Sequence, residues 1–342
     1  VYLDVYHISS DALKVVQILF LVWNAVNDPL MGYMQDIGCC NMTWIMDRRK
    51  VILYAGPVFA VSFLIFWFPW STSNSWISGL HLVVSLYLFD TLLTLVLSAY
   101  CGLLVEACKH HKQRVRCLVY SEVFEFLGAS IITPLNYLSN ELRDFAKFQI
   151  GCVVVTIVGA ACMMFGAYNL PQSIDRSDVK EEIQLAKEAT YKKALKVSWQ
   201  IIKEPRFICL LGSQFFRTMR HVFLSQFLII IVEALVSRAG FLPMGSGALS
   251  IFYASIRASG MILFTLLWWP TAKLGTHVMI IILSVLSILN VVVALILGRD
   301  DVRVVAIFIA IEMTLGMCGM HSYYMLLGGE VIDTDAKEHN RA

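Results

Sequence analysis

Charged residues are scarce in this sequence, and their scarcity excludes an ordinary water-soluble domain. Asp, Glu, Lys and Arg make up 15% of the 342 residues, whereas hydrophobic residues make up 58% and the mean hydropathy is +0.69. Soluble domains usually contain about 45–50% apolar and about 25% charged residues. A soluble fold of this length could not bury so much apolar surface, so the composition indicates a membrane protein.

An excess of basic charge is also missing. The formal net charge is +2, and the basic residues lie between apolar runs instead of forming one continuous stripe. Nucleic-acid binding requires a basic surface of that kind. We therefore expect no nucleic-acid partner.

Motifs of the common catalytic and metal sites are absent as well. The sequence contains no Gly-rich phosphate loop, no Gly-x-Ser-x-Gly elbow, no His-Glu-x-x-His and no Cys-x-x-Cys pair. Adjacent histidines occur in residues 109–112, but histidines between lysines are more typical of a solvated cytoplasmic turn than of a metal site. Most of the nine cysteines lie inside apolar runs, which favours small buried hydrophobes over a disulfide framework. We expect neither an enzyme nor a bound metal or cofactor.

Long apolar runs are abundant and predict an all-α membrane protein with nine complete membrane-spanning helices. A bilayer core about 30 Å thick requires roughly 20 apolar helical residues to cross it. Residues 1–7 resemble the end of an earlier helix, because Ser9, Ser10 and Asp11 supply N-cap chemistry for the next one. The predicted spans are residues 13–35, 51–69, 77–107, 116–138, 146–169, 207–234, 246–268, 276–297 and 303–327.

A polar interval at residues 171–206 divides the chain into two helical bundles. We predict an N-terminal bundle over residues 1–170, with its first helix truncated, and a C-terminal bundle over residues 207–342. Apolar residues recur at helical spacing within the interval, and the opposite face is charged. This pattern favours an amphipathic helix on the cytoplasmic membrane surface over a flexible linker.

Basic residues gather in almost every second loop and predict the orientation of the chain. The loops after the runs ending near residues 35, 107 and 169 contain several Lys or Arg residues, and the loop after residue 268 contains Lys273. Because translocation of basic residues is unfavourable during insertion, these loops are predicted to be cytoplasmic. The tripeptide Asn41-Met42-Thr43 is an N-glycosylation acceptor pattern in one of these loops, and its use would contradict this orientation.

Residues 23–36, WNAVNDPLMGYMQD, resemble the second helix of the major facilitator superfamily, in particular of its glycoside-pentoside-hexuronide cation symporter branch. Gly32 and Asp36, followed by the basic Arg48 and Arg49, resemble the cytoplasmic gate motif of the superfamily. In that motif Gly32 would permit close helix approach, and Asp36 would pair with basic groups at the membrane edge. Residues 269–275 form a weaker echo of the motif in the second half.

The resemblance extends over nearly the whole chain. Residues 63–70, 86–90 and 329–335 resemble an orphan animal branch of the superfamily that has no known substrate. Membership would imply a major facilitator fold of twelve helices in two six-helix halves. The first helix would then be truncated here and the last two would be missing.

The symporter branch coordinates sodium or a proton with two aspartates one helical turn apart, a nearby Asn and an Arg on the preceding turn. The matching positions here are Leu21, Asn24, Asn27 and Asp28, so one carboxylate remains. Sodium prefers several hard oxygen ligands, and a single formal charge attracts it more weakly. The resemblance therefore implies Asn24, Asn27 and Asp28 as cation-binding candidates for sodium or proton coupling. The alternative role for Asp28 is a helix-packing hydrogen bond.

Five charged residues lie near the middle of predicted spans, where an ionised side chain costs about 2.5–3.5 kcal/mol. Two of the arginines are three residues apart and project from one helical face. We predict that the set lines a polar cavity whose arginines favour an anionic or zwitterionic substrate group. The alternative is structural ion pairing of Arg257 with Glu312 and of Arg217 with Asp90. The five residues are Asp90, Arg217, Arg220, Arg257 and Glu312.

Together these observations predict a secondary carrier that moves a small organic solute by alternating access between two bundles. We expect it to lie in the lipid bilayer of the plasma membrane as a monomer. The alternative is a transport-inactive relative that serves as a membrane scaffold or a receptor-like protein. The depleted cation cluster favours this alternative.

Overall fold

The structure is a computed structural model whose helices form two compact units. It describes residues 2, 5–37, 43–71, 74–108, 110–131, 134–135, 144–170, 199–200, 202–243, 246–297, 301–318 and 322–339. These residues contain no β-strand, which confirms the predicted all-α class. Unit 1 comprises Val1–Ala107 and Ile131–Ala194, and unit 2 comprises Cys108–Ser130 and Leu195–Ala342.

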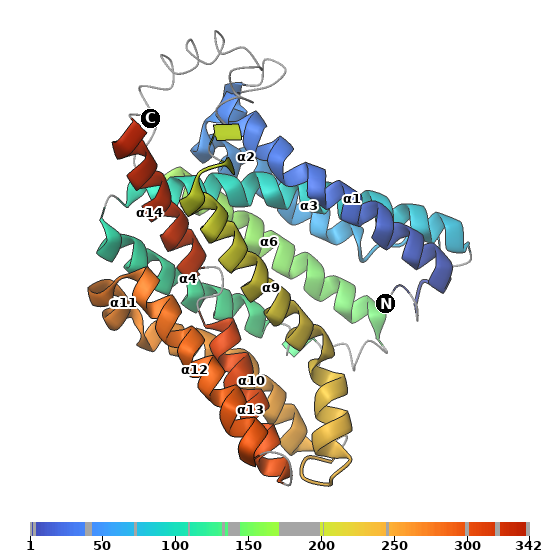
Figure 1. Ribbon diagram of the computed structural model, residues 1–342. Helices are drawn as coiled ribbons and strands as arrows, with labels where there is room; N and C mark the ends of the chain where they lie inside the picture. The colour runs from blue at the N-terminus through green and yellow to red at the C-terminus, as the bar shows by residue number, and fades with distance from the viewer. Residues whose placement is uncertain are drawn as a thin grey trace. The chain divides into compact units, whose positions relative to one another are not determined.

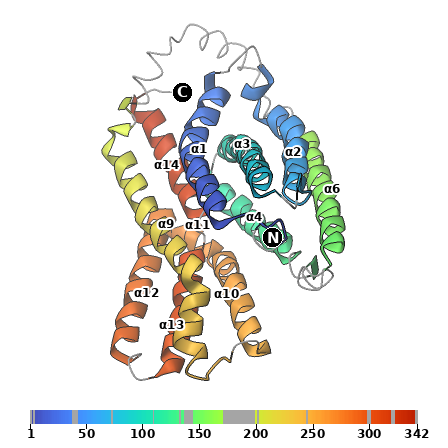
Figure 2. The ribbon, with the colours of Figure 1, turned by 90° about the vertical axis from the view of Figure 1, so that its right-hand side faces the viewer.

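Four long helices build unit 1. They are α1 (Ser10–Ile37), α2 (Arg48–Ile65), α3 (Ser75–Ala107) and α6 (Phe145–Asn169). Figure 2 shows α2 between α3 and α6, while α1 packs on the other side of α3. The predicted N-cap of α1 is confirmed, because the Ser9 hydroxyl accepts the Ala12 N–H at 3.2 Å.

Unit 2 is organised around α13 (Val302–Met317), which contacts α9 (Pro205–Val232), α10 (Gly247–Leu266) and α12 (Thr276–Leu297) (Figure 1). A π-helical turn, Glu233–Ser237, extends α9, and its Val236 is fully buried in the core with Val232, Ile256 and Met313. The short α11 (Trp268–Leu274) follows α10, and α14 (Ser322–His339) follows α13 and packs on α9 and α12.

The helix α4 (His111–Ser130) belongs to unit 2 by its packing, although the predicted N-terminal bundle of residues 1–170 includes it. It contacts α10, α11 and α14. Polar side chains explain the grouping, because Glu122 of α4 accepts a hydrogen bond from Ser322 of α14 at 2.6 Å. The predicted amphipathic linker helix falls almost wholly outside the described residues, as does Asn41.

The predicted count of nine spans is too high for the described residues. Six helices are long and apolar enough to cross a membrane, and a seventh is obtained if α10 and α11, bent by 47°, form one span. Two predicted spans, 51–69 and 116–138, have no matching helix of this length and apolarity among the described residues. The observed α2 has 18 residues and begins with three basic ones, whereas α4 carries charges along its length.

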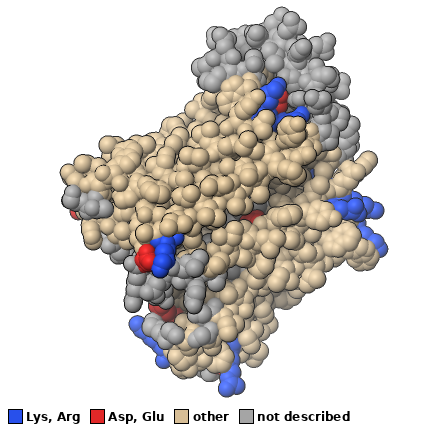
Figure 3. Space-filling model, turned by 180° about the vertical axis from the view of Figure 1, so that it is seen from behind, with Lys and Arg blue, Asp and Glu red and all other residues tan. Residues whose placement is uncertain are grey.

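The surfaces of these helices suit a lipid solvent. Large apolar side chains such as Phe165 (72% exposed) and Leu295 (75% exposed) project outward. Figure 3 shows a face on which uncharged residues cover most of the surface, while Lys and Arg gather in a few patches at its margins. Cys152 and Cys318 are buried free thiols, as predicted, but Cys162 and Cys209 are exposed on this apolar surface.

Candidate functional site

A polar cluster joins α1 to α3 within unit 1. The Asn27 side chain, which is fully buried, donates from Nδ2 to Asp90 Oδ2 and to Thr94 Oγ1, each at 3.1 Å. Thr94 Oγ1 in turn donates to Asp28 Oδ1 at 2.9 Å. The Asn27 amide and the Thr94 hydroxyl thus hold two carboxylates in one network. Pro29 leaves the Ala25 carbonyl without its helical N–H donor beside this network.

The cluster contains a second carboxylate that the local sequence pattern lacks. Asn27 and Asp28, two of the cation-binding candidates, both belong to the cluster, and Asp90, predicted for the substrate cavity, joins them through its hydrogen bond to Asn27. Asn24 is exposed and has no hydrogen bond in the described part of the chain. Sequence reasoning missed Thr94, and its only signal was a position four residues after Asp90 on the same helical face.

One Asn27 atom in this cluster is unsatisfied. Its Oδ1 is buried and has no hydrogen-bond partner among the described residues. A buried amide oxygen without a donor costs about 1–3 kcal/mol. Together with two carboxylates and the Thr94 hydroxyl, it forms a set of hard oxygen donors of the kind that binds sodium.

In unit 2 the predicted residues Arg220 and Glu312 form an ion pair. Arg220 Nη1 lies 3.0 Å from Glu312 Oε1, and Glu312 is only 4% exposed. Glu312 also accepts from Ser287 Oγ at 2.7 Å and from Asn290 Nδ2 at 3.3 Å. Glu312, which the alternative interpretation pairs with Arg257, therefore forms its ion pair with Arg220 among the described residues. The side chain of Arg257 lies outside the described residues.

Arg217 differs from Arg220 because its charge is not neutralised by any carboxylate that the structure describes. Its Nη2 donates to the Cys318 carbonyl at 2.7 Å, and its guanidinium lies 5.4 Å from the centre of the Tyr324 ring. Its Nε is buried and has no hydrogen-bond partner among the described atoms. A neutral carbonyl and an aromatic face leave the guanidinium a net positive group in an apolar helix bundle.

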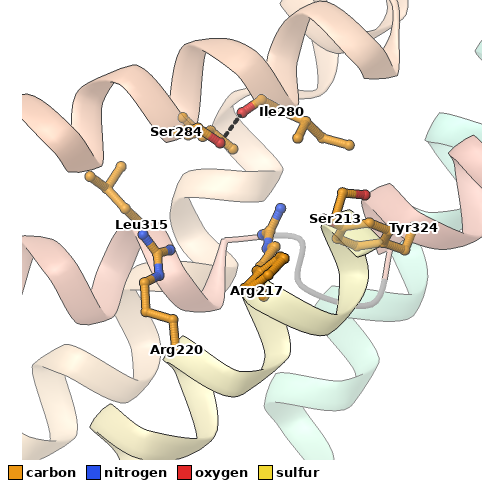
Figure 4. Close-up of a pocket in the computed structure, with 9 residues that line it drawn as sticks. Ser213, Arg217, Arg220, Ile280, Ser284, Leu315 and Tyr324 are labelled. Atoms are coloured by element: carbon orange, nitrogen blue, oxygen red, sulfur yellow. Dashed lines mark hydrogen bonds between the residues drawn. The ribbon is translucent and has the colours of Figure 1, made fainter. Parts of the chain in front are cut away.

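Arg217 and Arg220 line one cavity of about 320 Å³ in unit 2. Figure 4 shows both side chains projecting from α9 toward it, with Ser213 and Tyr324 at one end and Leu315 at the other. The wall opposite α9 comes from α12 and includes Ile280 and Ser284. The structure thus brings two of the predicted arginines together in a cavity, as their three-residue spacing indicates.

Arg48 and Arg49 of the predicted gate motif each contact another helix of unit 1 near its C-terminal end. Arg49 donates to the Ala167 carbonyl at 2.8 Å and to the Tyr168 carbonyl at 3.0 Å, so it satisfies the last turn of α6. Arg48 packs against Gly102, where a methyl group would overlap the guanidinium. A Cβ added to Gly32 would meet no described atom within 4 Å, so the close helix approach expected at Gly32 is not observed among the described residues. The Asp36 side chain lies outside the described residues.

His111 connects α4 to two other helices of unit 2. Its Nδ1 lies 3.1 Å from Glu330 Oε1, and its Nε2 lies 3.2 Å from the Thr271 carbonyl. Both ring nitrogens face acceptors, which favours the doubly protonated ring, and the bond to Glu330 raises the pKa of His111. The expectation of a solvated turn is therefore wrong for His111, which is half-buried.

Comparison with known proteins agrees with the resemblance derived from the sequence. The model of the family described as MFS/sugar transport protein matches residues 2–341. Transmembrane protein 180 of Gallus gallus is 24% identical over 358 residues, which cover 98% of this chain and 68% of the relative. Transmembrane protein 180 of Mus musculus is 24% identical over 369 residues, with 99% and 68% coverage.

Proposed function

The chain belongs to the MFS/sugar transport protein family, and from this membership we propose that it is a secondary carrier of a small organic solute that works by alternating access. Membership makes it a multi-pass integral membrane protein of the major facilitator superfamily. It also points to a transporter and away from an enzyme.

The substrate in this proposal carries an anionic group. The observation that supports it is the Arg217 guanidinium, which lines a cavity of about 320 Å³ and has no carboxylate partner among the described residues. Guanidinium groups bind carboxylates and phosphates through charge-assisted hydrogen bonds. Arg220 adds donors, but Glu312 already neutralises its charge. A small solute with one anionic group would complete the electrostatics of the cavity.

Transport in this proposal is coupled to a cation at the cluster of Asn27, Asp28, Asp90 and Thr94. Two carboxylates, a hydroxyl and the unsatisfied Asn27 Oδ1 are four groups that could offer hard oxygen ligands to sodium. A proton on one of the two carboxylates would satisfy the same network without a metal ion. The second carboxylate weakens the argument for a transport-inactive scaffold.

Uptake by the full protein in proteoliposomes tests the anionic substrate. A panel of radiolabelled carboxylates and phosphate esters is offered, and Arg217→Ala is compared with Arg217→Lys. Because a hydrogen bond to a charged group contributes about 1.5–3 kcal/mol, Arg217→Ala should raise KM roughly tenfold to hundredfold. Arg217→Lys should retain part of the affinity.

Arg238→Ala is the matched control, because Arg238 is exposed in the turn after the π-helix and does not line the cavity. If Arg217→Ala and Arg238→Ala change KM equally, the cavity does not bind the anionic group. Failure of the wild-type protein to accumulate any solute would favour the scaffold instead.

Imposed gradients test the coupling ion separately. Uptake is measured with an inward sodium gradient, with an inward proton gradient and with neither. Asn27→Leu removes the amide that bonds Asp90 directly and is linked to Asp28 through Thr94, so it should abolish stimulation by the coupling gradient while exchange of internal for external substrate continues. Equal stimulation of wild-type and Asn27→Leu protein would contradict a role for this cluster.

We also propose that the protein acts as a monomer in the plasma membrane. Surface biotinylation of intact cells would locate it, and light scattering of the purified protein would give its oligomeric state. Retention in an internal membrane would contradict the first statement, and a stable dimer would contradict the second.

A further inference from the structure

Unit 2 contains a second cavity, of about 290 Å³, that the proposed function does not use. Residues of α4, α9, α10 and α13 line it. Its lining combines acidic, imidazole and thioether side chains, namely Glu122, Glu125, His221, Met261, Met313 and Met317. None of these residues lines the arginine cavity.

Glu122 contributes a buried carboxylate to the wall of this cavity. Glu122 is only 7% exposed. Its Oε1 accepts a hydrogen bond from the Ser322 hydroxyl at 2.6 Å. No basic side chain pairs with it in the part of the chain that the structure describes, and its Oε2 has no described hydrogen bond. A buried carboxylate with a single neutral donor is poorly compensated and favours a cation beside it.

A second acid lies on the same side of α4. Glu125 follows Glu122 by three residues, so both project from one helical face, and both line the cavity. Two acids on one wall give the cavity a negative potential, opposite to that of the arginine cavity. The two cavities should therefore select ligands of opposite charge.

The remaining walls determine what kind of cation fits. Met261, Met313 and Met317 offer polarizable thioethers, and Ile256 and Leu228 are aliphatic. A small hard ion requires about six oxygen ligands, which these walls cannot supply. The volume of about 290 Å³ is far larger than an ion, since a water molecule occupies about 30 Å³, and it is close to the roughly 300 Å³ at which ligand pockets begin.

We propose that this cavity binds a small organic cation with an apolar body, and that Glu122 is its counter-ion. The cationic group would lie against the Glu122 carboxylate, and the apolar body would contact the methionine side chains. This assignment does not depend on the arginine cavity or on the cation cluster of unit 1. It adds a binding site for a second class of ligand to the carrier.

Equilibrium binding to the full protein in lipid nanodiscs tests the proposal. The probe is radiolabelled N-methyl-4-phenylpyridinium, and protein-free nanodiscs measure its partition into lipid. Wild-type protein should bind it saturably, whereas Glu122→Gln, which keeps the shape and removes the charge, should weaken binding at least tenfold. The uncharged analogue 4-phenylpyridine should also bind at least tenfold more weakly to the wild type.

A second variant separates loss of charge from loss of folding. Ser225→Trp fills the cavity from α9 and leaves both acids in place, so it should also abolish binding while the helical content and the melting temperature stay near those of the wild type. Glu204→Gln is the matched control, because Glu204 precedes α9, makes no side-chain cap hydrogen bond and does not line the cavity.

Three results would overturn the assignment. They are absence of saturable binding by the wild-type protein, wild-type affinity in both Glu122→Gln and Ser225→Trp, and equal binding of the charged and uncharged probes. None of these results would bear on the proposal that anionic solutes are taken up through the arginine cavity. The failure of this proposal can therefore be told apart from failure of the proposed function.

Discussion

Removing the acid of the buried ion pair should destabilise the protein more than removing the whole pair. Glu312→Leu leaves the Arg220 guanidinium beside Ser287 without its counter-charge. Loss of one partner of a buried pair costs about 3–5 kcal/mol, but the Arg220 side chain is 36% exposed, so we expect about 2–3 kcal/mol. The ratio of folded to unfolded protein should fall roughly thirtyfold to 150-fold.

The double variant Arg220→Leu/Glu312→Leu removes both charges, and apolar replacement of a buried pair is often close to neutral. We expect its free energy of unfolding to lie within about 1 kcal/mol of the wild type. Arg220→Leu alone should fall between the two, because Glu312 keeps its bonds from Ser287 and Asn290 and can take up a proton. Unfolding by SDS in mixed micelles, followed by circular dichroism, measures all four proteins. If the double variant loses the sum of the two single losses, the pair is not coupled and the reasoning fails.

Two further predictions concern α4 and α10. Glu330 raises the pKa of His111, so the stabilisation from this pair should be complete below about pH 6.5 and disappear as the pH rises through the raised value. The melting temperature should therefore fall as the pH rises above about 6.5, and less so in His111→Gln; an unchanged pH profile in that variant would contradict the assignment. A Cβ at Gly260 would lie 3.1 Å from a backbone carbon of α13, so Gly260→Ala should cost about 1–3 kcal/mol of unfolding free energy. Gly159→Ala, where a Cβ meets no described atom within 4 Å, serves as its control in the same melting assay, and equal melting of both variants would refute the steric argument.

Local sequence patterns predicted where the helices lie better than they predicted which helices contact one another. Apolar runs located most of the membrane-crossing helices, because each helix satisfies its own backbone and needs only a long apolar segment. The predicted number of spans was too high for the described residues, because α2 is short and begins with basic residues and α4 carries charges along its length. Arg217 and Arg220 share a cavity as predicted, because helical geometry fixes the direction of side chains three residues apart.

Contacts between helices could not be read from the sequence. Asn27 and Asp90 are 63 residues apart, and nothing in either local pattern determines how α1 and α3 are aligned along their length. For the same reason, the hydrogen bonds from Ser287 and Asn290 of α12 to Glu312 could not be predicted. Their signal was present in the sequence as two polar residues three apart in a very apolar helix, which is a costly position unless both find a partner.

The grouping of α4 with unit 2 has a mechanical consequence. The covalent chain passes from one unit to the other at three places, after Ala107, after Ser130 and after Ala194. The first crossing is short, since α3 ends at Ala107 and α4 begins at His111. Four residues of fully extended chain span at most about 13–14 Å, so the end of α3 and the start of α4 cannot separate further than this.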